Sequence, residues 1–189
     1  MLADAAQSPS WDRLFEGAVG QEGHFTTQQA AEAGYSPQLL AKYLKNGRVV
    51  RVRRGVYRIV HFPAGEHEDL ATLWLWSEKA GVFSHETALM LHELSDVLPR
   101  KANMTLPQDW AKRRLRVPAD VLLHYGDIKK DERVDIGAIP VTNVRRTLID
   151  CIDAHVSFEH IDVALRQATA RKLLDKRDAK AIRTHARDA

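Results

Sequence analysis

The sequence predicts an α+β protein, with an N-terminal winged helix-turn-helix domain followed by a mixed α/β C-terminal domain. Two short helical patterns lie close together between residues 28 and 45, and an alternating, β-rich stretch follows at residues 49–60. In the rest of the chain, strand-like and helical segments cluster instead of alternating strictly. A doubly wound parallel sheet would require that alternation, so the order of the segments favours α+β.

The N-terminal helices are predicted from apolar spacing and from residues that suit helix ends. Apolar residues at helical spacing indicate a first helix over residues 11–19. A second helix is expected over residues 28–33, because a preceding threonine can accept a hydrogen bond from a free backbone N–H. Gly34 ends it, and Ser36 and Pro37 suit the cap and first position of a third helix that runs to about residue 45. Two helices joined by such a short, glycine-containing turn are typical of a helix-turn-helix.

The third predicted helix has an apolar stripe that we expect to pack inward and a polar side that faces solvent. Its outward residues are Gln38, Ala41, Lys42 and Lys45. Residues 49–60 then alternate and are interrupted by Arg53, Arg54 and Gly55, which predicts a two-stranded hairpin with the glycine at positive φ. This hairpin would form the wing.

Charge is unevenly distributed along the chain, although the net charge is only +3. Residues 33–60 contain seven of the 28 Lys and Arg residues and none of the 25 Asp and Glu residues. The flanking segments, 1–32 and 61–99, each contain one basic residue, against five and seven acidic residues respectively. A basic winged segment between acidic flanks is typical of a protein that binds nucleic acid.

We therefore expect the third helix to enter the major groove of double-stranded DNA and the wing to contact phosphates or the minor groove. The expected contacts are Gln38, Lys42, Lys45, Arg48, Arg51, Arg53, Arg54 and Arg58. A second basic run, residues 100–116, could extend the same track through Lys112, Arg113, Arg114 and Arg116. The alternative is a solvated winged helix that serves protein contacts, but this leaves the absence of acidic residues unexplained.

A linker is expected at residues 62–66, which are rich in turn formers. We place the domain boundary there, with the DNA-binding domain over residues 1–62 and an α+β effector domain over residues 63–189. In the second domain, helices are predicted over residues 66–80, 84–94, 144–154, 158–174 and beyond 178, and strands over 82–83, 102–106, 121–125 and 134–141. Ser84 is the expected cap of the helix that follows it.

Composition favours ordinary globular folding, since 189 residues with 44% hydrophobic side chains are enough for one large or two small domains. No apolar run is long enough to cross a membrane, and residues 1–10 lack the basic start and apolar middle of a secretion signal. We expect a cytoplasmic protein that does not act on membranes. The single cysteine, Cys151, can form neither an internal disulfide nor a multi-cysteine zinc site, and its apolar surroundings predict a buried thiol.

No catalytic residue, metal site or cofactor is expected, and we predict that the protein is not an enzyme. Acidic residues beside His67, His85 and His92 invite a metal interpretation. However, His85 and His92 are seven residues apart, roughly 10 Å along a helix, which is too far to ligate one ion without help. Glycine-rich phosphate loops, nucleophile elbows and nuclease motifs are absent from the sequence.

Two further groups of residues permit both a binding role and a simpler one. Trp74, Trp76 and Phe83 could line a ligand pocket, although helical spacing favours core packing. Arg145 and Arg146 open a predicted helix and could bind a partner or DNA, although a surface pair is the simpler interpretation.

Three segments resemble the AbiEi antitoxins of type IV toxin-antitoxin systems. They are residues 34–57, which include GYSPQLL and GRVVRVRRGVY, residues 83–89 (FSHETAL) and residues 141–150 (VTNVRRTLID). Their order and spacing are more specific than each motif alone, and the resemblance extends from about residue 11 to residue 174. Asn143 and Val144 depart from the proline and acidic residue that we expect there, which indicates a different cap for the next helix.

The resemblance implies a bacterial transcriptional repressor that binds inverted repeats in its own promoter and counteracts a nucleotidyltransferase toxin encoded beside it. The matching DNA-binding positions are Ser36, Gln38, Lys42, Lys45, Arg51, Arg53 and Arg54. The second domain would supply the antitoxin activity, for which stable direct contact with the toxin is not required.

Two other functions stay open from the residues alone. One is a regulator without a toxin partner, whose second domain senses a ligand or positions the wing. The other is a DNA-modifying or DNA-cutting enzyme with a winged targeting domain. A missing nucleotidyltransferase gene nearby would favour the first, and plasmid cleavage in the presence of a divalent metal would favour the second.

Overall fold

The chain forms two compact units, Met1–Lys79 and Ala80–Ala189, in a computed structural model that describes residues 8–188. Residues 1–7, which belong to the stretch where we found no secretion signal, lie outside the described residues. We predicted a boundary after residue 62, with the helix of residues 66–80 opening the second domain. In the structure this helix, α4 (Glu68–Trp76), belongs to the N-terminal unit because it contacts all three strands of that unit's sheet.

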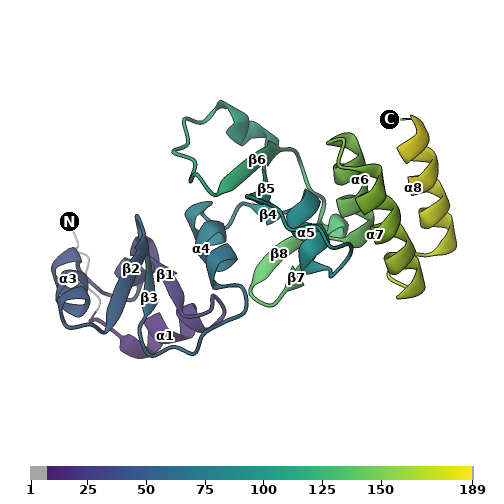
Figure 1. The fold of residues 1–189 in the computed structure, drawn as a ribbon. Coiled ribbons are helices and arrows are strands. Elements are labelled where there is room, and N and C mark those ends of the chain that lie inside the picture. Colours follow the sequence, from purple (N-terminus) through teal and green to yellow (C-terminus); the bar gives the residue numbers. More distant parts are fainter. Residues whose placement is uncertain (1–7, 189) are drawn as a thin grey trace. The chain divides into compact units, whose positions relative to one another are not determined.

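The N-terminal unit is a winged helix-turn-helix (Figure 1), as predicted. Before α4 it contains helices α1 (Trp11–Val19), α2 (Thr27–Glu32) and α3 (Pro37–Lys45), and strands β1 (His24–Thr26), β2 (Val49–Arg53) and β3 (Val56–Ile59). The strands are antiparallel in the order β1-β3-β2, so β3 is central. Leu14, Phe25, Leu40 and Ile59 belong to one buried cluster that joins the helices to the sheet.

Side-chain caps explain where the first three helices begin. Ser10, Thr26 and Ser36 each occupy the N-cap position and accept a hydrogen bond from the backbone N–H three residues ahead. Thr26 and Gln29 also form a reciprocal capping box, with distances of 2.9 and 3.1 Å. Helix α2 therefore begins one residue earlier than predicted, whereas the predicted start of α1 and the predicted cap of α3 are confirmed.

The C-terminal unit has a five-stranded mixed sheet in the order β6-β5-β4-β8-β7. Its strands are β4 (Val82–Phe83), β5 (Ala102–Leu106), β6 (Val121–Tyr125), β7 (Arg133–Ile136) and β8 (Ile139–Thr142). The pairs β4/β8 and β5/β6 are parallel, and the other pairs are antiparallel. The single strand predicted over residues 134–141 is instead two strands, because Gly137, with φ of 57°, turns the chain between them.

Helices α5 (His85–Leu91), α6 (Val144–Asp153), α7 (Phe158–Ala170) and α8 (Lys176–Asp188) complete this unit, and the last three lie side by side (Figure 1). Buried apolar residues from all four helices form one core, which includes Cys151, so the predicted buried thiol is confirmed. The Asn143 side chain caps α6 by accepting a hydrogen bond from the Arg146 N–H at 2.8 Å. None of the helices within residues 8–188 is long and apolar enough to cross a membrane.

Helix α4 is attached to the central strand β3 by Arg58. The Arg58 guanidinium forms an ion pair with Glu68, at 2.6 Å between Nη2 and Oε1, and Nη2 also donates to the Phe62 carbonyl at 3.0 Å. Only 16% of the Arg58 side chain is exposed. Burial raises the pKa of Glu68, but a hydrogen bond from the Gly65 N–H and the Arg58 charge outweigh it and hold that pKa below its usual value.

Arg58→Ala is expected to lower the free energy of unfolding by about 1–3 kcal/mol, because it leaves the Glu68 carboxylate without its cation. Arg54→Ala, which removes an exposed arginine of the same hairpin, should change it by less than about 0.5 kcal/mol. Urea unfolding followed by circular dichroism measures both variants. An Arg58→Ala protein as stable as the wild type would contradict the attachment.

Candidate nucleic-acid interface

Helix α3 presents a polar side to solvent because its apolar side packs into the core. Leu40 is 5% exposed and faces inward, whereas Gln38, Lys42 and Lys45 are exposed. The Leu39 N–H donates to Ser36 Oγ at 3.2 Å, so this exposed serine caps the helix at its N-terminal end. The predicted outward residues of α3 are thus exposed together. We call the exposed side of α3, together with residues 48–55, the basic surface.

The hairpin extends this surface along an edge strand. β2 is at the edge of its sheet, and after its buried first residue, Val49, its side chains are exposed or half-buried. Arg51 and Arg54 are exposed, Arg53 is half-buried, and Gly55 adopts the predicted positive φ, 78°, in the turn. Cations on an edge strand also discourage pairing with other sheets, so these arginines suit a structural role as well as a binding role.

An aromatic cluster positions Arg48 where α3 meets β2. The guanidinium carbon of Arg48 lies 5.2 Å from the centre of the Tyr43 ring, which is a cation–π contact. Tyr43 stacks on Trp11 and meets Tyr35 edge to face, with ring centres 5.8 and 5.3 Å apart. The charge of Arg48 is therefore held on a rigid support while the side chain stays exposed.

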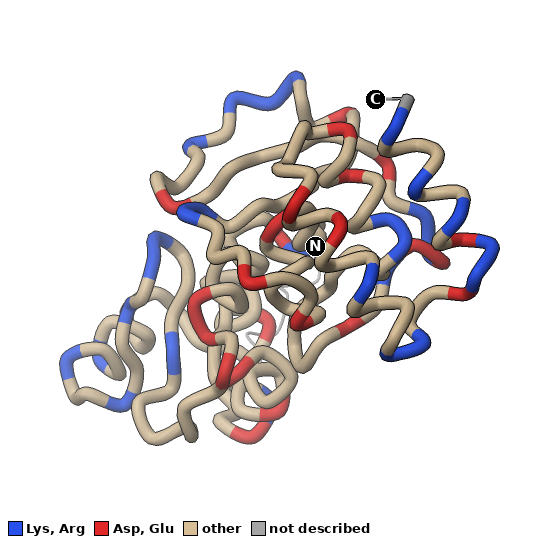
Figure 2. Tube along the Cα trace, turned by 45° about the vertical axis from the view of Figure 1, so that its right-hand side comes forward, with Lys and Arg blue, Asp and Glu red and all other residues tan. Residues whose placement is uncertain are grey.

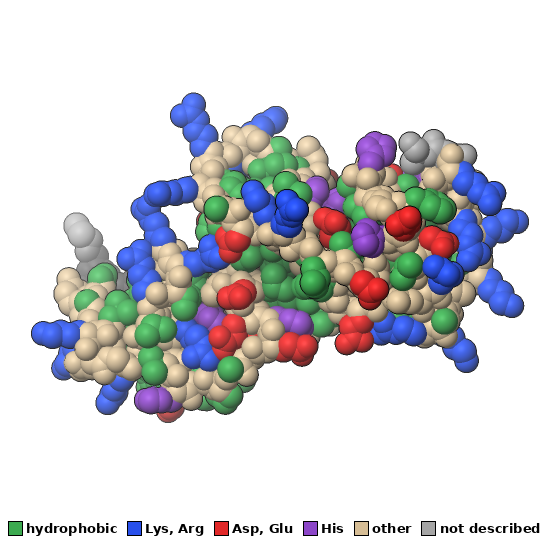
Figure 3. Space-filling model, viewed as in Figure 1, with side chains coloured by type: hydrophobic (Ala, Val, Ile, Leu, Met, Phe, Trp, Pro, Cys, Tyr) green, Lys and Arg blue, Asp and Glu red, His purple; other side chains and the backbone are tan. Residues whose placement is uncertain are grey.

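The basic surface carries cations that the protein does not neutralise. Among the described residues, Lys42, Lys45, Arg51 and Arg54 form no ion pair. Blue segments mark α3 and the hairpin in Figure 2, without red between them, and blue side chains project from the same elements in Figure 3. Such a surface is favourable for a polyanion, because its lysines and arginines can replace the counterions that are condensed on the phosphates.

Arg58 differs from the other predicted contacts, because its charge is used inside the N-terminal unit. Its guanidinium is directed to Glu68 and to the carbonyls that precede α4, so it lies outside the basic surface. The prediction treated α4 as part of another domain and therefore missed this partner. The sequence did contain a signal for this partner, since the acidic residue Glu68 lies ten residues after Arg58.

The second basic run lies in the C-terminal unit, in the loop that leads to β6. Lys112, Arg113, Arg114 and Arg116 are all exposed there. The Arg113 guanidinium lies 3.8 Å from the ring centre of Trp110, which is 9% exposed. This cation–π contact fixes the start of a loop that presents four cations within five residues.

Two histidines of the C-terminal unit, His85 and His124, lie against each other and are bound to neighbouring polar groups. His85 and His124 stack with ring centres 3.6 Å apart; His85 Nδ1 is 2.8 Å from Ser84 Oγ, and His124 Nε2 is 3.0 Å from Asn103 Oδ1. Ser84 Oγ also lies 2.7 Å from Thr105 Oγ1, so the predicted side-chain cap of α5 is not formed. Within residues 8–188, no three His, Cys, Asp or Glu side chains are grouped to hold a metal ion.

Of the two arginines at the start of α6, only one is a surface residue. Arg145 is exposed and forms an ion pair with Asp178 at 3.3 Å. Arg146 is half-buried between Glu132 and Asp150, at 2.9 and 2.7 Å, and its role is therefore structural. The prediction missed this because Glu132 lies fourteen residues earlier and meets Arg146 only in the folded unit.

Acid should destabilise the C-terminal unit through the stacked histidines. Burial, followed by the neighbouring charges of His124 and Arg146, lowers the pKa of His85 to about 3, whereas the unfolded value is about 6.5. The unfolded chain therefore binds more protons between these values, and stability falls as the pH drops through this window. His85→Asn can keep a hydrogen bond to Ser84 and tolerates the φ of 52° at this position.

Urea unfolding between pH 7 and pH 4 should show a smaller loss of stability for His85→Asn than for the wild type. Parallel pH profiles for the two proteins would contradict this assignment.

Comparisons with known proteins concern mainly the winged segment. Residues 12–60 match the family model described as "Transcriptional regulator, AbiEi antitoxin". No curated protein matches the chain. Among solved structures, the chain is similar to the crystal structure of RV2827C protein from Mycobacterium tuberculosis. The identity is 13% and the TM-score 0.45, over 98% of this chain and 85% of that chain. The match to this family of transcriptional regulators over residues 12–60 confirms the resemblance predicted for this segment.

Proposed function

We propose that this protein is a sequence-specific, double-stranded DNA-binding transcriptional repressor that acts in the cytoplasm and binds inverted repeats in its own promoter. The observation that carries the proposal is the basic surface, where exposed cations on α3 and the hairpin face solvent without acidic neighbours in residues 33–60. The family match over residues 12–60 supports a regulator.

Each part of the basic surface has a distinct role in this proposal. Helix α3 enters the major groove, where the Gln38 amide can pair with adenine and the ammonium groups of Lys42 and Lys45 can donate to guanine or to phosphates. Arg51 and Arg54 of the wing neutralise phosphates or enter the minor groove. Ser36, at the start of α3, contacts the sugar-phosphate backbone of the DNA. The cationic loop Lys112–Arg116 adds phosphate contacts from the C-terminal unit.

The C-terminal unit would supply antitoxin activity against a nucleotidyltransferase toxin. This part of the proposal is supported by the family description and by the two C-terminal motifs, FSHETAL and VTNVRRTLID. Its test is co-expression with the nucleotidyltransferase encoded beside the gene. Restored growth with the full chain, and with a DNA-binding-deficient variant, would support an antitoxin role separate from repression; growth arrest with the full chain would refute it.

The affinity for DNA should depend strongly on salt. If about four to six phosphates are contacted, a plot of log affinity against log salt concentration should have a slope of about −4 to −5, because each contact releases counterions. Fluorescence anisotropy with promoter DNA between low and physiological salt measures this slope. Replacing Lys112, Arg113, Arg114 and Arg116 by alanine should make it shallower, and a nearly flat wild-type slope would overturn the phosphate contacts.

Two single substitutions should separate sequence recognition from general affinity. Lys42→Ala is expected to reduce discrimination between the promoter site and a scrambled duplex, whereas Arg51→Ala should weaken both duplexes by similar factors. Arg13→Ala, an exposed cation on α1, is the matched control and should change neither. Gel shifts with both duplexes provide the measurement. A Lys42→Ala, Arg51→Ala double variant that binds like the wild type would refute both roles.

A further inference from the structure

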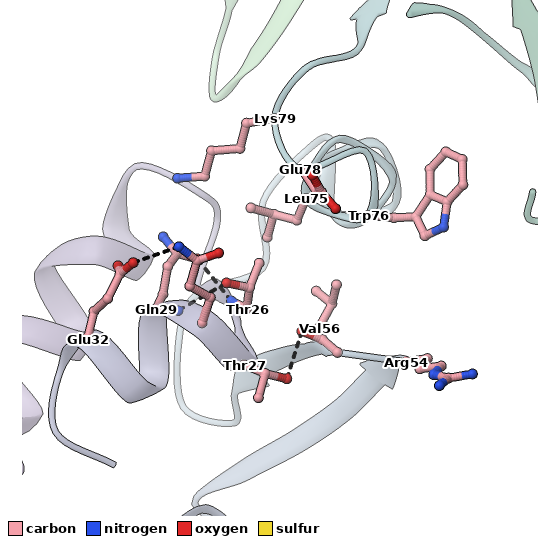
Figure 4. A pocket seen from close by; sticks show the side chains of 12 residues that line it. Thr26, Thr27, Gln29, Glu32, Arg54, Val56, Leu75, Trp76, Glu78 and Lys79 are labelled. Carbon is pink, nitrogen blue, oxygen red and sulfur yellow. Dashed lines mark hydrogen bonds between the residues drawn. The ribbon is translucent and has the colours of Figure 1, made fainter. Parts of the chain in front are cut away.

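A pocket of about 510 Å³ in the N-terminal unit does not gather its cations around one point (Figure 4). It lies between the first turns of α2, the hairpin turn and the end of α4. Core packing was the favoured prediction for Trp76, yet this side chain is half-buried and lines the pocket. The Lys79 ammonium lies over α2, whereas the Arg54 guanidinium and the Trp76 indole are at the other end and point away from it.

Helix α8, in the C-terminal unit, does bring cations together on one side. An α-helix turns by about 100° per residue, so residues spaced by four, three and four positions fall within about 60° of one another around its axis. Four exposed cations have this spacing, and we call them the α8 stripe: Lys176, Lys180, Arg183 and Arg187. They follow one another over about 16 Å of the helix. Blue segments recur along the chain that leads to the C mark in Figure 2, and blue side chains project from the end that carries α8 in Figure 3.

The stripe faces solvent because the neighbouring side of α8 packs into the core. Ala179 and Ile182 are 3% and 1% exposed and belong to the buried cluster of the C-terminal unit, and Ala186 packs against the same cluster. Their spacing of three and four residues defines one side of the helix. This packing fixes the rotation of α8 about its axis, so the stripe has a defined position on the unit.

The carboxylates around α8 are directed to other partners. Asp175 Oδ1 accepts a hydrogen bond from the Asp178 N–H at 2.6 Å, and the Asp178 side chain pairs with Arg145 of α6 at 3.3 Å. Asp153 Oδ1 lies 2.6 Å from Nε2 of His185. Each of these carboxylates therefore has a partner outside the stripe.

The stripe itself is not neutralised within the part of the chain that the structure describes. None of its four cations forms an ion pair with another residue of the range 8–188. Like charges three and four residues apart on a helix repel one another and destabilise it. A bound polyanion would remove this repulsion.

The chemistry of the stripe favours the phosphates of a duplex over other polyanions. Single strands are held by aromatic side chains on which the bases stack, and residues 171–187 contain no Phe, Tyr or Trp. Binding to a membrane surface uses an apolar helix side, which in α8 is buried. The centre of a protein interface is rich in apolar and aromatic residues, which the stripe lacks. One strand of B-DNA carries a phosphate about every 3.4 Å along its axis, so the stripe corresponds in length to about five phosphates.

We propose that the α8 stripe binds the sugar-phosphate backbone of double-stranded DNA without reading its sequence. When the winged unit holds a promoter site, the connection between the units keeps the stripe at a high effective concentration near the same duplex. The stripe then adds affinity, whereas α3 supplies discrimination. The choice of DNA rests on the proposed function, but contact of the stripe with a duplex that lacks the promoter site does not.

Fluorescence anisotropy of the full chain with a promoter duplex and a scrambled duplex tests the stripe. Lys180→Gln combined with Arg183→Gln removes its two central cations and retains good helix formers. This variant should make the slope of log affinity against log salt shallower by about 1–2 on both duplexes, because each lost phosphate contact changes the slope by about 0.9. Both affinities should fall by similar factors, at least about tenfold at 0.1 M salt.

Arg13→Gln combined with Lys130→Gln is the matched control. It removes the same charge from two exposed positions outside α8 and outside the basic surface, so both slopes should stay those of the wild type. Urea unfolding followed by circular dichroism should show that the stripe variant is at least as stable as the wild type, since repulsion along α8 is reduced. A stripe variant with the slopes and affinities of the control would overturn the proposal.

Competition measurements test the choice of partner. The labelled scrambled duplex is displaced from the wild type and from the stripe variant by unlabelled duplex DNA, duplex RNA or polyglutamate. The substitutions should weaken the binding of duplex DNA. A loss of affinity that occurs with duplex RNA or polyglutamate but not with duplex DNA would overturn DNA as the partner of the stripe.

The two duplexes also separate this proposal from the proposed repressor function. A wild type that does not prefer the promoter duplex, but whose affinity falls in the stripe variant, would refute sequence-specific binding and keep the stripe. A wild type that prefers the promoter duplex, and whose affinities are unchanged in the stripe variant, would refute only the stripe.

Discussion

The N-terminal unit depends on the antiparallel pairing of β3 with both β1 and β2. Tyr57 is opposite Phe25 on one side and Arg51 on the other, so one strand satisfies backbone groups along both of its edges. Strand β1 leads directly into α2, and α3 leads into β2 through a short turn. The helix-turn-helix and the wing are therefore positioned by the same short strand, and a change in its register would move both.

The same strand pairing separates two uses of arginine. Arg58, on the central strand, forms internal bonds that attach α4. Arg51 and Arg54, on the edge strand and its turn, have no acidic partner among residues 8–188. Leaving cations unneutralised costs the folded state some repulsion, which internal carboxylates could have removed. Their retention on one side of the unit is understandable if an external polyanion neutralises them.

The C-terminal unit differs from the N-terminal unit in that several of its polar side chains are buried against one another. The stacked rings of His85 and His124, the hydroxyl groups of Ser84 and Thr105, and the guanidinium of Arg146 are each bound to partners from other elements. Two of the motifs that resemble the AbiEi family, FSHETAL and VTNVRRTLID, lie at these positions. In the structure, FSHETAL contains the start and first turns of α5, and VTNVRRTLID contains the cap and body of α6. Each motif also contains polar groups that hold its helix in place.

The sequence by itself determined the first helix over residues 11–19, the cap of α3 at Ser36, the hairpin with its turn at Gly55, the buried thiol of Cys151 and the charge of residues 33–60. Apolar spacing, capping, alternation and composition act over a few residues, so the sequence alone is enough to predict these features. Only the tertiary structure decided that α4 belongs to the winged unit, that Arg58 and Arg146 are structural, that residues 133–142 form two strands, and that Trp76 lines a pocket. These outcomes, apart from the local turn at Gly137, depend on contacts between separate elements. Local spacing carries little information about such contacts, since many partners of suitable charge or size are available along the chain.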